Sequence, residues 1–248
     1  MNIIKLLISS FLFVSLTTGL CVVSPAGKTQ LLVPPGQVSQ GLAKSDWSSI
    51  REAYEAGRHA CQPVEGGWQA SNPGQQWTTK FDGRGFVSEP KGGGWQWGLE
   101  LKRYGFPGAE RVISDKPAVR AFGQRVTYVW DAVLSEWFVN DTRGLEHGFT
   151  VKERPVLLAT RSLQSVPLNF TLAVRGSLVG RVTMDGQGVL FCDNSGATVV
   201  NYSGLKVWDA DGKILPSWFA PLDPQQPSLV TLQVDRRASC RERVYSSV

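Results

Sequence analysis

Apolar residues recur at every second position along most of the chain from Gly66 onward, which is the spacing of a strand with one buried face. The clearest case is the pair of segments 76–81 and 86–89, joined by the turn sequence Asp-Gly-Arg-Gly. Similar segments follow at 95–101, 125–130, 137–139, 145–151, 168–174, 181–184, 188–191, 197–202, 205–208, 213–215 and 229–234. Short strands that recur about every 8–12 residues, with Gly and Asp turns between them, predict an all-β fold, an antiparallel β-sandwich.

A helical period is confined to a segment that begins at Ser45, which can cap a helix. Trp47, Ile50 and Tyr54 share one face of this helix, and Pro63 ends the pattern. The other face carries Arg51, Glu52, Glu55 and Arg58. We therefore predict one N-terminal amphipathic helix over residues 45–60, covering a sheet face or edge with its apolar side chains inward. Helix and sandwich together form one predicted domain, residues 45–234.

The first 26 residues have the pattern of a secretory signal peptide. Lys5 precedes an apolar stretch at 6–16, which is shorter than the roughly 20 apolar residues of a membrane span. Cleavage after Gly19 or after Ala26 would fit the preference for small residues. We expect a secreted or cell-surface protein whose mature form has no membrane span, with residues 27–44 as an extended lead-in.

Composition and charge add to these predictions mainly at the two ends of the chain. The chain has 248 residues, of which 42% are hydrophobic and 19% charged, and this excludes a disordered chain or a coiled coil. The net charge is +5, but Lys5 contributes one positive charge and residues 235–248 contribute two, which leaves +2 for the rest. No nucleic-acid partner is predicted, because no basic stripe crosses the domain. The Arg-rich segment 235–248 has no strand pattern, and we expect a non-native tail, with a genuine basic tail as the alternative; a non-native tail would imply that the natural chain continues differently after about Val234.

Four cysteines are present. Cys21 lies in the leader, where Leu20 disfavours lipidation, and Cys240 lies in the tail. Cys61 and Cys192 could form a disulfide in an oxidising compartment or stay as two separate buried side chains. No cysteine–histidine cluster suggests a structural metal site.

Candidate catalytic groups are few. His59 and His147 are the only histidines and no nucleophile elbow is present, so we expect both to serve in capping or edge hydrogen bonding. A glycosidase needs two facing carboxylates. The acidic residues near strands form no recognisable pair, and we expect them to face solvent or to pair with Arg103, Arg143 and Arg154; they are Glu100, Asp131, Glu136, Asp141, Glu146 and Glu153. We predict no catalytic residue, cofactor or metal, and we read Asp209-x-Asp211-Gly212 as a hairpin turn because the calcium-loop pattern is incomplete.

Nine tryptophans are many for this length. By alternation, Trp95 and Trp97 share one face of a strand, with Trp77 on the neighbouring hairpin. These three rings are candidate ligand-stacking residues, because a planar aromatic row suits sugar rings. The alternative, which we favour, is that they fill the sandwich core.

Three segments carry a family resemblance: WQWGLEL at 95–101, GLEHGFTV at 144–151 and YSGLKVWDADGK at 202–213. In this order they resemble the N-terminal module of bacterial secreted proteins with FG-GAP (integrin-α-like) β-propeller repeats and, more distantly, the β-sandwich module before SBBP-type propeller repeats. The likeness covers about residues 45–234. It implies an extracellular all-β module whose partner is the downstream propeller of the same protein, and it assigns no catalytic residue.

The hypothesis we favour is therefore a non-enzymatic, exported structural or interaction module that precedes propeller repeats. The second hypothesis is a carbohydrate-binding module that stacks surface carbohydrate on exposed tryptophans. A hydrolase is third, and it would require two convergent carboxylates in a cleft.

Overall fold

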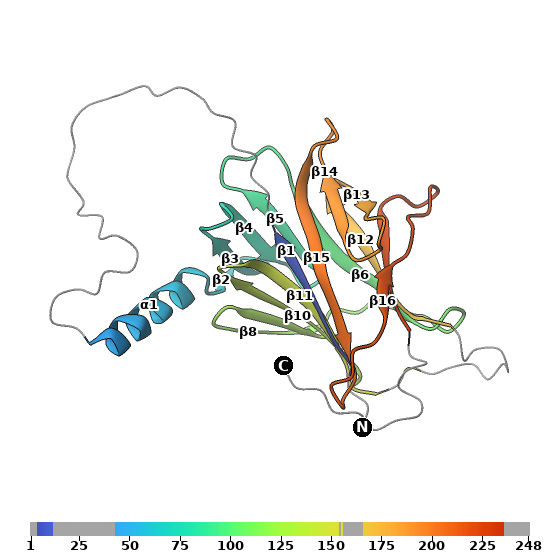
Figure 1. The fold of residues 1–248 in the computed structure, drawn as a ribbon, viewed down its shortest axis with the longest axis horizontal. Helices are drawn as coiled ribbons and strands as arrows, with labels where there is room; N and C mark the ends of the chain where they lie inside the picture. The colour runs from blue at the N-terminus through green and yellow to red at the C-terminus, as the bar shows by residue number, and fades with distance from the viewer. Residues whose placement is uncertain (1–3, 12–42, 154, 156–165, 236–248) are drawn as a thin grey trace.

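The computed structural model describes residues 4–11, 43–153, 155 and 166–235, and these form two antiparallel sheets and one helix (Figure 1). The first sheet has the order β13-β14-β15-β1-β11-β10-β9-β8. Its strands are β1 (Ile4–Phe11), β8 (Ala118–Phe122), β9 (Arg125–Val129), β10 (Leu134–Asp141), β11 (Gly144–Val151), β13 (Val179–Val182), β14 (Val189–Cys192) and β15 (Thr198–Trp208).

The second sheet has the order β16-β17-β12-β6-β5-β4-β3-β2, with β7 beside β6. Its strands are β2 (Gln62–Val64), β3 (Gly67–Asn72), β4 (Trp77–Phe81), β5 (Phe86–Pro90), β6 (Trp97–Gly105), β7 (Arg111–Val112), β12 (Leu168–Gly176), β16 (Ser217–Phe219) and β17 (Leu229–Val234). The two sheets and the helix confirm the predicted all-β, sandwich-like fold.

Alternation of side chains explains why these segments form strands. In β17, Val230, Leu232 and Val234 are buried, while the residues between them are part-exposed. Large aromatic side chains from both sheets make up much of the core; the fully buried ones are Trp77, Trp97, Tyr128, Tyr202, Phe81, Phe86, Phe138, Phe149, Phe170, Phe191 and Phe219. Because each fully buried large apolar side chain contributes about 1.5–3 kcal/mol, this shared core holds the sheets together.

Strand β15 joins two segments that the sequence pattern separates, 197–202 and 205–208. Gly204 lies between them with φ 77°, a left-handed conformation that glycine adopts without strain. The register of β15 against β1 shifts at this point, between the pairs Ser9–Ser203 and Leu7–Lys206. The glycine therefore marks a bulge within one strand and not a turn between two.

Helix α1 (Lys44–Arg58) confirms the predicted helix but not its predicted orientation. No residue of α1 is buried, and Ile50 and Tyr54 are 51% and 63% exposed. In Figure 1 the helix projects away from the sheets. The expected inward apolar face is wrong because the two sheets bury their apolar faces against each other and do not need α1 as a cover. The expected cap is also wrong, since the helix begins after Ala43 and Ser45 lies inside its first turn.

Substitutions on the exposed face of α1 should therefore leave the sandwich stable. We expect Ile50→Ala and Tyr54→Ala each to change the free energy of unfolding by less than about 0.5–1 kcal/mol, as for exposed positions in general. Leu232→Ala, in the core strand β17, is the matched control and should cost about 2–5 kcal/mol. Urea unfolding measures all three. A cost above about 2 kcal/mol at Ile50 or Tyr54 would mean that the helix is packed.

A buried amide pair ties the sheets together near the end of α1. Asn72 of β3 donates from Nδ2 to Oδ1 of Asn140 on β10 at 2.9 Å. Asn140 donates in turn to the backbone carbonyls of His59 and Ser71, at 3.0 and 2.9 Å. The contact to His59 fixes the C-terminal end of the helix on the sandwich, although the body of the helix is exposed.

The predicted leader overlaps a strand of the structure. Residues 4–11 form β1, between β11 and β15, while residues 12–26, 27–42 and 236–248, with Cys21 and Cys240, lie outside the described residues. Removal of the leader on export stays a prediction. No helix in the described part of the chain is long and apolar enough to cross a bilayer.

Candidate functional site

The three candidate stacking tryptophans do not form a row. Trp77 on β4 and Trp97 on β6 have no exposed surface, so neither can stack on a ligand in this structure. Trp95 is part-exposed and lies in the loop before β6, because the strand begins two residues later than the sequence pattern suggests. Its ring meets that of Trp77 edge to face, with centroids 6.2 Å apart. Two of the three rings therefore belong to the core, and only Trp95 remains as a candidate.

A shallow hollow of about 410 Å³ lies beside Trp95. Its wall includes Glu89, Gln96 and Ser177, three polar side chains, together with glycine backbone from the loop before β6 and the end of β12. Gln96 donates from Nε2 to Glu89 at 3.0 Å, and the hydroxyl of Ser177 accepts from the backbone N–H of Gln96 at 3.3 Å. One aromatic ring with polar groups around it is a chemistry that suits a small polyhydroxylated ligand.

The chain also brings together a carboxylate, an imidazole and a phenol inside the core. Oε1 of Glu136 on β10 lies 2.8 Å from Nε2 of His147 on β11. Nδ1 of His147 lies 2.8 Å from the hydroxyl of Tyr202 on β15. Trp130 donates from Nε1 to the second oxygen of Glu136 at 3.0 Å. We call Glu136, His147 and Tyr202 the buried triad.

The buried triad has the chemical order of a proton relay but not its accessibility. All three side chains are 0% exposed, and the imidazole stacks on Phe138 with centroids 4.8 Å apart. Burial raises the pKa of Tyr202 well above its usual value, and the nearby Glu136 carboxylate adds to this, so the hydroxyl keeps its proton. In this structure the triad joins strands by hydrogen bonds, and His147 serves in the core of a central strand and not at an edge or a cap.

Sequence reasoning named Glu136 and His147 separately but missed their pairing. In the β10–β11 hairpin, Phe138 is opposite His147 and Glu136 is opposite Phe149. Glu136 and His147 are therefore diagonal neighbours on one face of the sheet. The short turn at Thr142 sets this register, so the pairing follows from the hairpin sequence itself. Tyr202 comes from β15, and no local pattern places it beside them.

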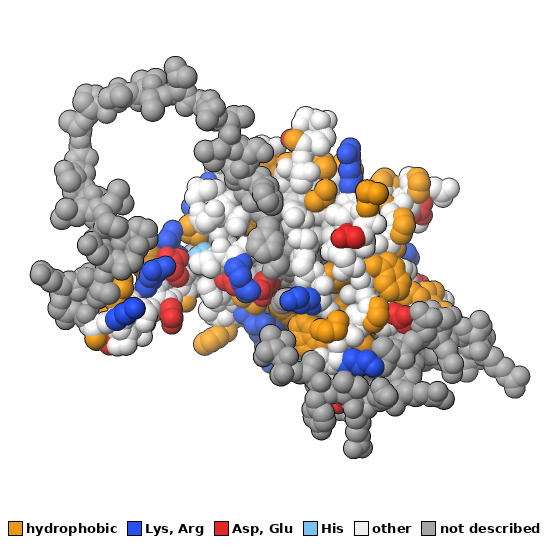
Figure 2. Space-filling view, in the orientation of Figure 1, with side chains coloured by type: hydrophobic (Ala, Val, Ile, Leu, Met, Phe, Trp, Pro, Cys, Tyr) orange, Lys and Arg blue, Asp and Glu red, His pale blue; other side chains and the backbone are white. Residues whose placement is uncertain are grey.

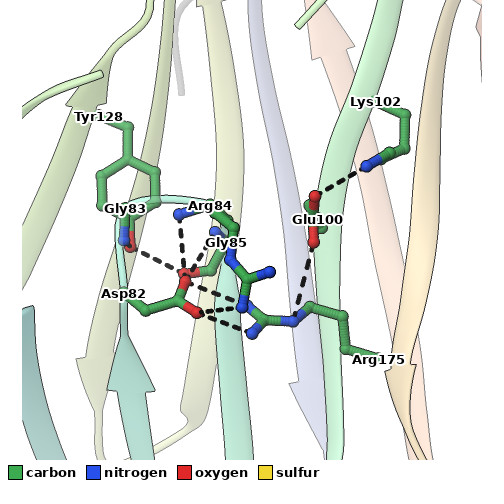
Figure 3. A network of polar contacts seen from close by, with 8 residues as sticks. All are labelled: Asp82, Gly83, Arg84, Gly85, Glu100, Lys102, Tyr128 and Arg175. Carbon is green, nitrogen blue, oxygen red and sulfur yellow. Dashed lines mark hydrogen bonds and ion pairs between the residues drawn. The ribbon is translucent and has the colours of Figure 1, made fainter. Parts of the chain in front are cut away.

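A second polar cluster lies on the turn between β4 and β5 (Figure 3). The Asp82 carboxylate accepts hydrogen bonds from the guanidinium groups of Arg84, at 3.1 Å, and Arg175, at 2.7 and 3.1 Å. Arg175 comes from β12, so this pair ties the turn to a distant strand of the same sheet. Burial would raise the pKa of Asp82, but the hydrogen bonds from Arg175 and Arg84 outweigh it and lower that pKa well below its usual range.

The same turn is held from the other sheet. Tyr128 of β9 donates its hydroxyl to the carbonyl of Gly85 at 2.8 Å and accepts from the N–H of Gly83 at 3.0 Å. On the outer side, Glu100 pairs with Lys102 at 2.9 Å and lies 3.9 Å from Arg175. All these charges are partnered within the cluster, so its evident role is to fix the turn.

Because of Asp82, the free energy of unfolding should depend on pH in the acidic range. A carboxyl whose pKa is lowered in the folded state stabilises the fold above its unfolded pKa, near 3.9, and this stabilisation disappears as pH falls below that value. We expect Asp82→Asn to cost about 1 kcal/mol at pH 7, as for a part-exposed charged hydrogen bond, and progressively less below about pH 4. Urea unfolding from pH 7 to 2.5 measures this. In an Arg175→Leu background, the cost of Asp82→Asn should depend less on pH. A cost that does not change with pH in the otherwise unaltered chain would contradict the prediction.

The remaining acidic candidates serve in local contacts. Asp141 and Glu146 both pair with Arg143, and Asp131 pairs with Arg111 at 2.8 Å. Glu153 is exposed, and Arg154, its expected partner, lies outside the described residues. In place of an ion pair, Arg103 donates to the hydroxyl of Thr171 at 3.4 Å.

The side chains considered as metal ligands, and the two described cysteines, also have structural roles. Asp209 accepts from the backbone N–H groups of Asp211 and Lys213, both at 3.0 Å, as expected for a hairpin turn. No group of three His, Cys, Asp or Glu side chains is placed to hold a metal within the part of the chain that the structure describes. Cys61 and Cys192 are free and buried, and burial raises the pKa of the Cys61 thiol to about 11.

A groove of about 590 Å³ separates α1 from the sandwich. On the helix side it is lined by Trp47 and by charged and polar residues such as Arg51 and Glu55, and on the sandwich side by the hairpin turns at Gln124 and Thr142. The helix thus turns Trp47 together with charged side chains toward the sandwich and leaves Ile50 and Tyr54 exposed. On the face shown in Figure 2, basic and acidic side chains are interspersed. Comparison with protein-family models, with curated proteins and with solved structures finds no match.

Proposed function

We propose that this chain is an exported, non-enzymatic module that docks onto β-propeller repeats further along the same protein, at the cell surface or outside the cell. The observation that carries the proposal is α1, whose Ile50 and Tyr54 side chains are exposed although the helix is amphipathic. Large apolar side chains exposed together mark interaction surfaces. The repeats are the partner that the resemblance of segments 95–101, 144–151 and 202–213 implies.

The chemistry of the interior supports a structural role. The carboxylate and imidazole groups that a hydrolase would need are the buried Glu136 and His147, which are hydrogen-bonded to each other and closed to solvent. The charged groups around Asp82 are bound to one another and fix a turn. Buried, fully partnered polar groups of this kind specify a single packing of the strands.

Hydrogen exchange in a chain that carries the proposed repeats after Asp235 tests the docking. Backbone amides of α1 should exchange at least about 10-fold more slowly when the downstream repeats are present than in the chain that ends at Asp235. The substitutions Ile50→Asp and Tyr54→Asp should remove this protection. Met184→Asp is the matched control, because Met184 is an exposed apolar residue that follows β13, which lies on the other side of the sheets from α1 in Figure 1. Equal exchange of α1 with and without the repeats would refute the docking, and finding no repeats in the gene would refute the architecture.

Carbohydrate binding remains the second candidate because one observation favours it, the part-exposed Trp95 beside the polar hollow. Titration with a panel of oligosaccharides, followed by intrinsic tryptophan fluorescence, tests it. If the hollow binds sugar, Trp95→Ala should weaken binding at least about 10-fold, since stacking on one ring contributes on the order of 1–2 kcal/mol. Binding that survives Trp95→Ala, or no binding at about 10 mM sugar, would remove this candidate.

A further inference from the structure

Strand β8 is an outer strand of the first sheet, so one of its sides is an edge of the sandwich (Figure 1). On its other side it pairs with β9, from Ala118–Val129 to Phe122–Arg125. No second strand of the described chain pairs with it. An outer strand presents unpaired backbone groups that another strand can bind. We call the unpaired side of β8 the free edge.

The register of the β8–β9 hairpin shows which backbone groups face the free edge. The turn has two residues, 123–124, and a hairpin with a turn of this length is closed by a hydrogen-bonded pair, here Phe122 and Arg125. Bonded pairs alternate along an antiparallel ladder. The N–H and C=O groups of Val119 and Ala121 therefore point away from β9, toward the free edge.

The free edge is short because both of its ends are closed. Gly123 continues the series of outward-facing residues, and its carbonyl accepts a hydrogen bond from the N–H of Cys61 at 2.7 Å. At the other end, Pro117 has no N–H to donate. Room for a further strand therefore remains at residues 119–121.

The two faces of the free edge carry different side chains. Val119 and Ala121 lie on the core face, since their partners on β9 are buried. Ala121 packs against the core, whereas Val119 is 36% exposed. Arg120 and Phe122 lie on the outer face, and Phe122 is 92% exposed. A strand bound here would cover apolar surface on both faces.

The surroundings of the free edge are cationic. Lys116 and Arg120 are exposed, and within the described residues neither has an ion-pair partner. Arg125 of β9 adds a third positive charge on the outer face. Of the acidic residues next in sequence, Asp115 lies beside Lys116, and Asp131 is already held in an ion pair of 2.8 Å. A segment with negative charge would therefore complement this edge.

A second copy of β8 fits the free edge poorly. If two copies pair antiparallel through the outward groups of Val119 and Ala121, each Val119 lies opposite Ala121 of the other copy. Arg120 then lies opposite Arg120 at a position where the strands are not hydrogen-bonded and side chains come closest. Like charges directly opposite each other destabilise a strand pair. The chemistry favours a different strand, with an acidic residue at this position.

We propose that the free edge of β8 is a strand-binding site for an acidic, extended segment of another protein. The segment pairs antiparallel with residues 119–121 and places Asp or Glu opposite Arg120. It has an apolar residue on each side of the carboxylate, so that the core face beside Val119 is covered, and an aromatic residue that packs on Phe122. The site is separate from the docking face on α1 and does not depend on the proposed function.

Titration of the 248-residue chain with the acetylated and amidated peptide TFVEVT, followed in nitrogen-15 spectra, tests the site. Antiparallel pairing places the glutamate of the peptide opposite Arg120 and its phenylalanine opposite Phe122. The amide signals of Val119 and Ala121 should shift in a saturable way, and their hydrogen exchange should slow. The peptide TFVKVT should bind at least about 5-fold more weakly, because an attractive cross-strand pair becomes a repulsive one.

Three variants separate the charge from the backbone pairing. Arg120→Glu should reverse the preference, so that TFVKVT binds at least about 5-fold more tightly than TFVEVT. Arg181→Glu is the matched control, because it makes the same charge change at an exposed position of β13, the other outer strand of the sheet, and it should keep the original preference. Val119→Pro removes an outward N–H without removing a bond to β9, and it should abolish binding of both peptides.

Four results would overturn the inference. No saturable shift at Val119 and Ala121 with about 2 mM TFVEVT would show that the edge does not bind a strand, even weakly. Equal affinity for the two peptides, or a preference that Arg120→Glu does not reverse, would remove the acidic segment as the occupant. Slow exchange of Val119 and Ala121 in the free chain would show that the edge is already covered. Protection of β8 that rises with protein concentration would assign the edge to a second copy.

Discussion

Trp97→Ala should lower the free energy of unfolding by about 3–5 kcal/mol, the usual cost of truncating a large buried aromatic side chain. Trp97 has no exposed surface, and its ring lies 5.1 Å from the rings of both Phe86 and Phe191. It therefore contacts residues of both sheets, and its removal leaves a cavity at their junction. Urea unfolding monitored by far-ultraviolet circular dichroism gives the value independently of tryptophan fluorescence.

Trp95→Ala is the matched control for this prediction, since the two residues are close in sequence and identical in type. Trp95 is part-exposed and packs on one edge of Trp77, so its removal should cost about 1 kcal/mol. Equal losses at both positions would mean that the two rings have equivalent surroundings, as the aromatic-row interpretation requires. A small loss at Trp97 would contradict its place in the core.

Glu136→Ala should be about as damaging as the loss of Trp97. It removes the acceptor of both His147 and Trp130 while leaving them buried, and breaking a buried, hydrogen-bonded pair in this way costs about 3–5 kcal/mol. Glu89→Ala is the control: Glu89 also lies on a strand, but its partners Lys80 and Gln96 are exposed, and such pairs contribute about 0–1 kcal/mol.

A double-mutant cycle separates the interaction from the packing. Glu136→Leu and His147→Leu should each be costly alone, because each leaves a buried polar partner without its mate. The double variant should lose less than the sum of the two, since neither Glu136 nor His147 is then left buried without the other, while the losses at Trp130 and Tyr202 are counted in the single variants as well. Strict additivity would show that Glu136 and His147 do not interact in solution.

The positions of the strands were predictable because they depend on residues that are close together in the sequence. The alternation in β17 and the Asp-Gly turn after Phe81 are visible in the sequence, and each gives the structure that its residues favour. The side chain of Asp82 accepts from the N–H of Arg84 two residues on, which is the usual reason for aspartate at the start of a turn.

What each element contacts was not predictable, because that depends on distant residues. The stripe on α1 indicates an amphipathic helix, but only the packing of the sheets on each other reveals that Ile50 and Tyr54 have nothing to cover. Arg175 reaches Asp82 across 93 positions of sequence, and no local pattern connects them. Likewise, the apolar residues at the N-terminus have the pattern of a leader, and their pairing with β11 and β15 depends on strands far along the chain.

Hydrogen exchange of the tryptophan indole N–H groups, followed in nitrogen-15 spectra, tests most directly whether the large aromatic side chains form a closed interior. The Nε1–H groups of Trp77 and Trp97 are buried and have no acceptor among the described residues, so their exchange requires opening of the fold. Both should exchange at least about 1000-fold more slowly than the indole of Trp95, with each signal assigned by a tryptophan-to-phenylalanine variant. Exchange at Trp97 as fast as at Trp95 would place that ring at the solvent and contradict the account.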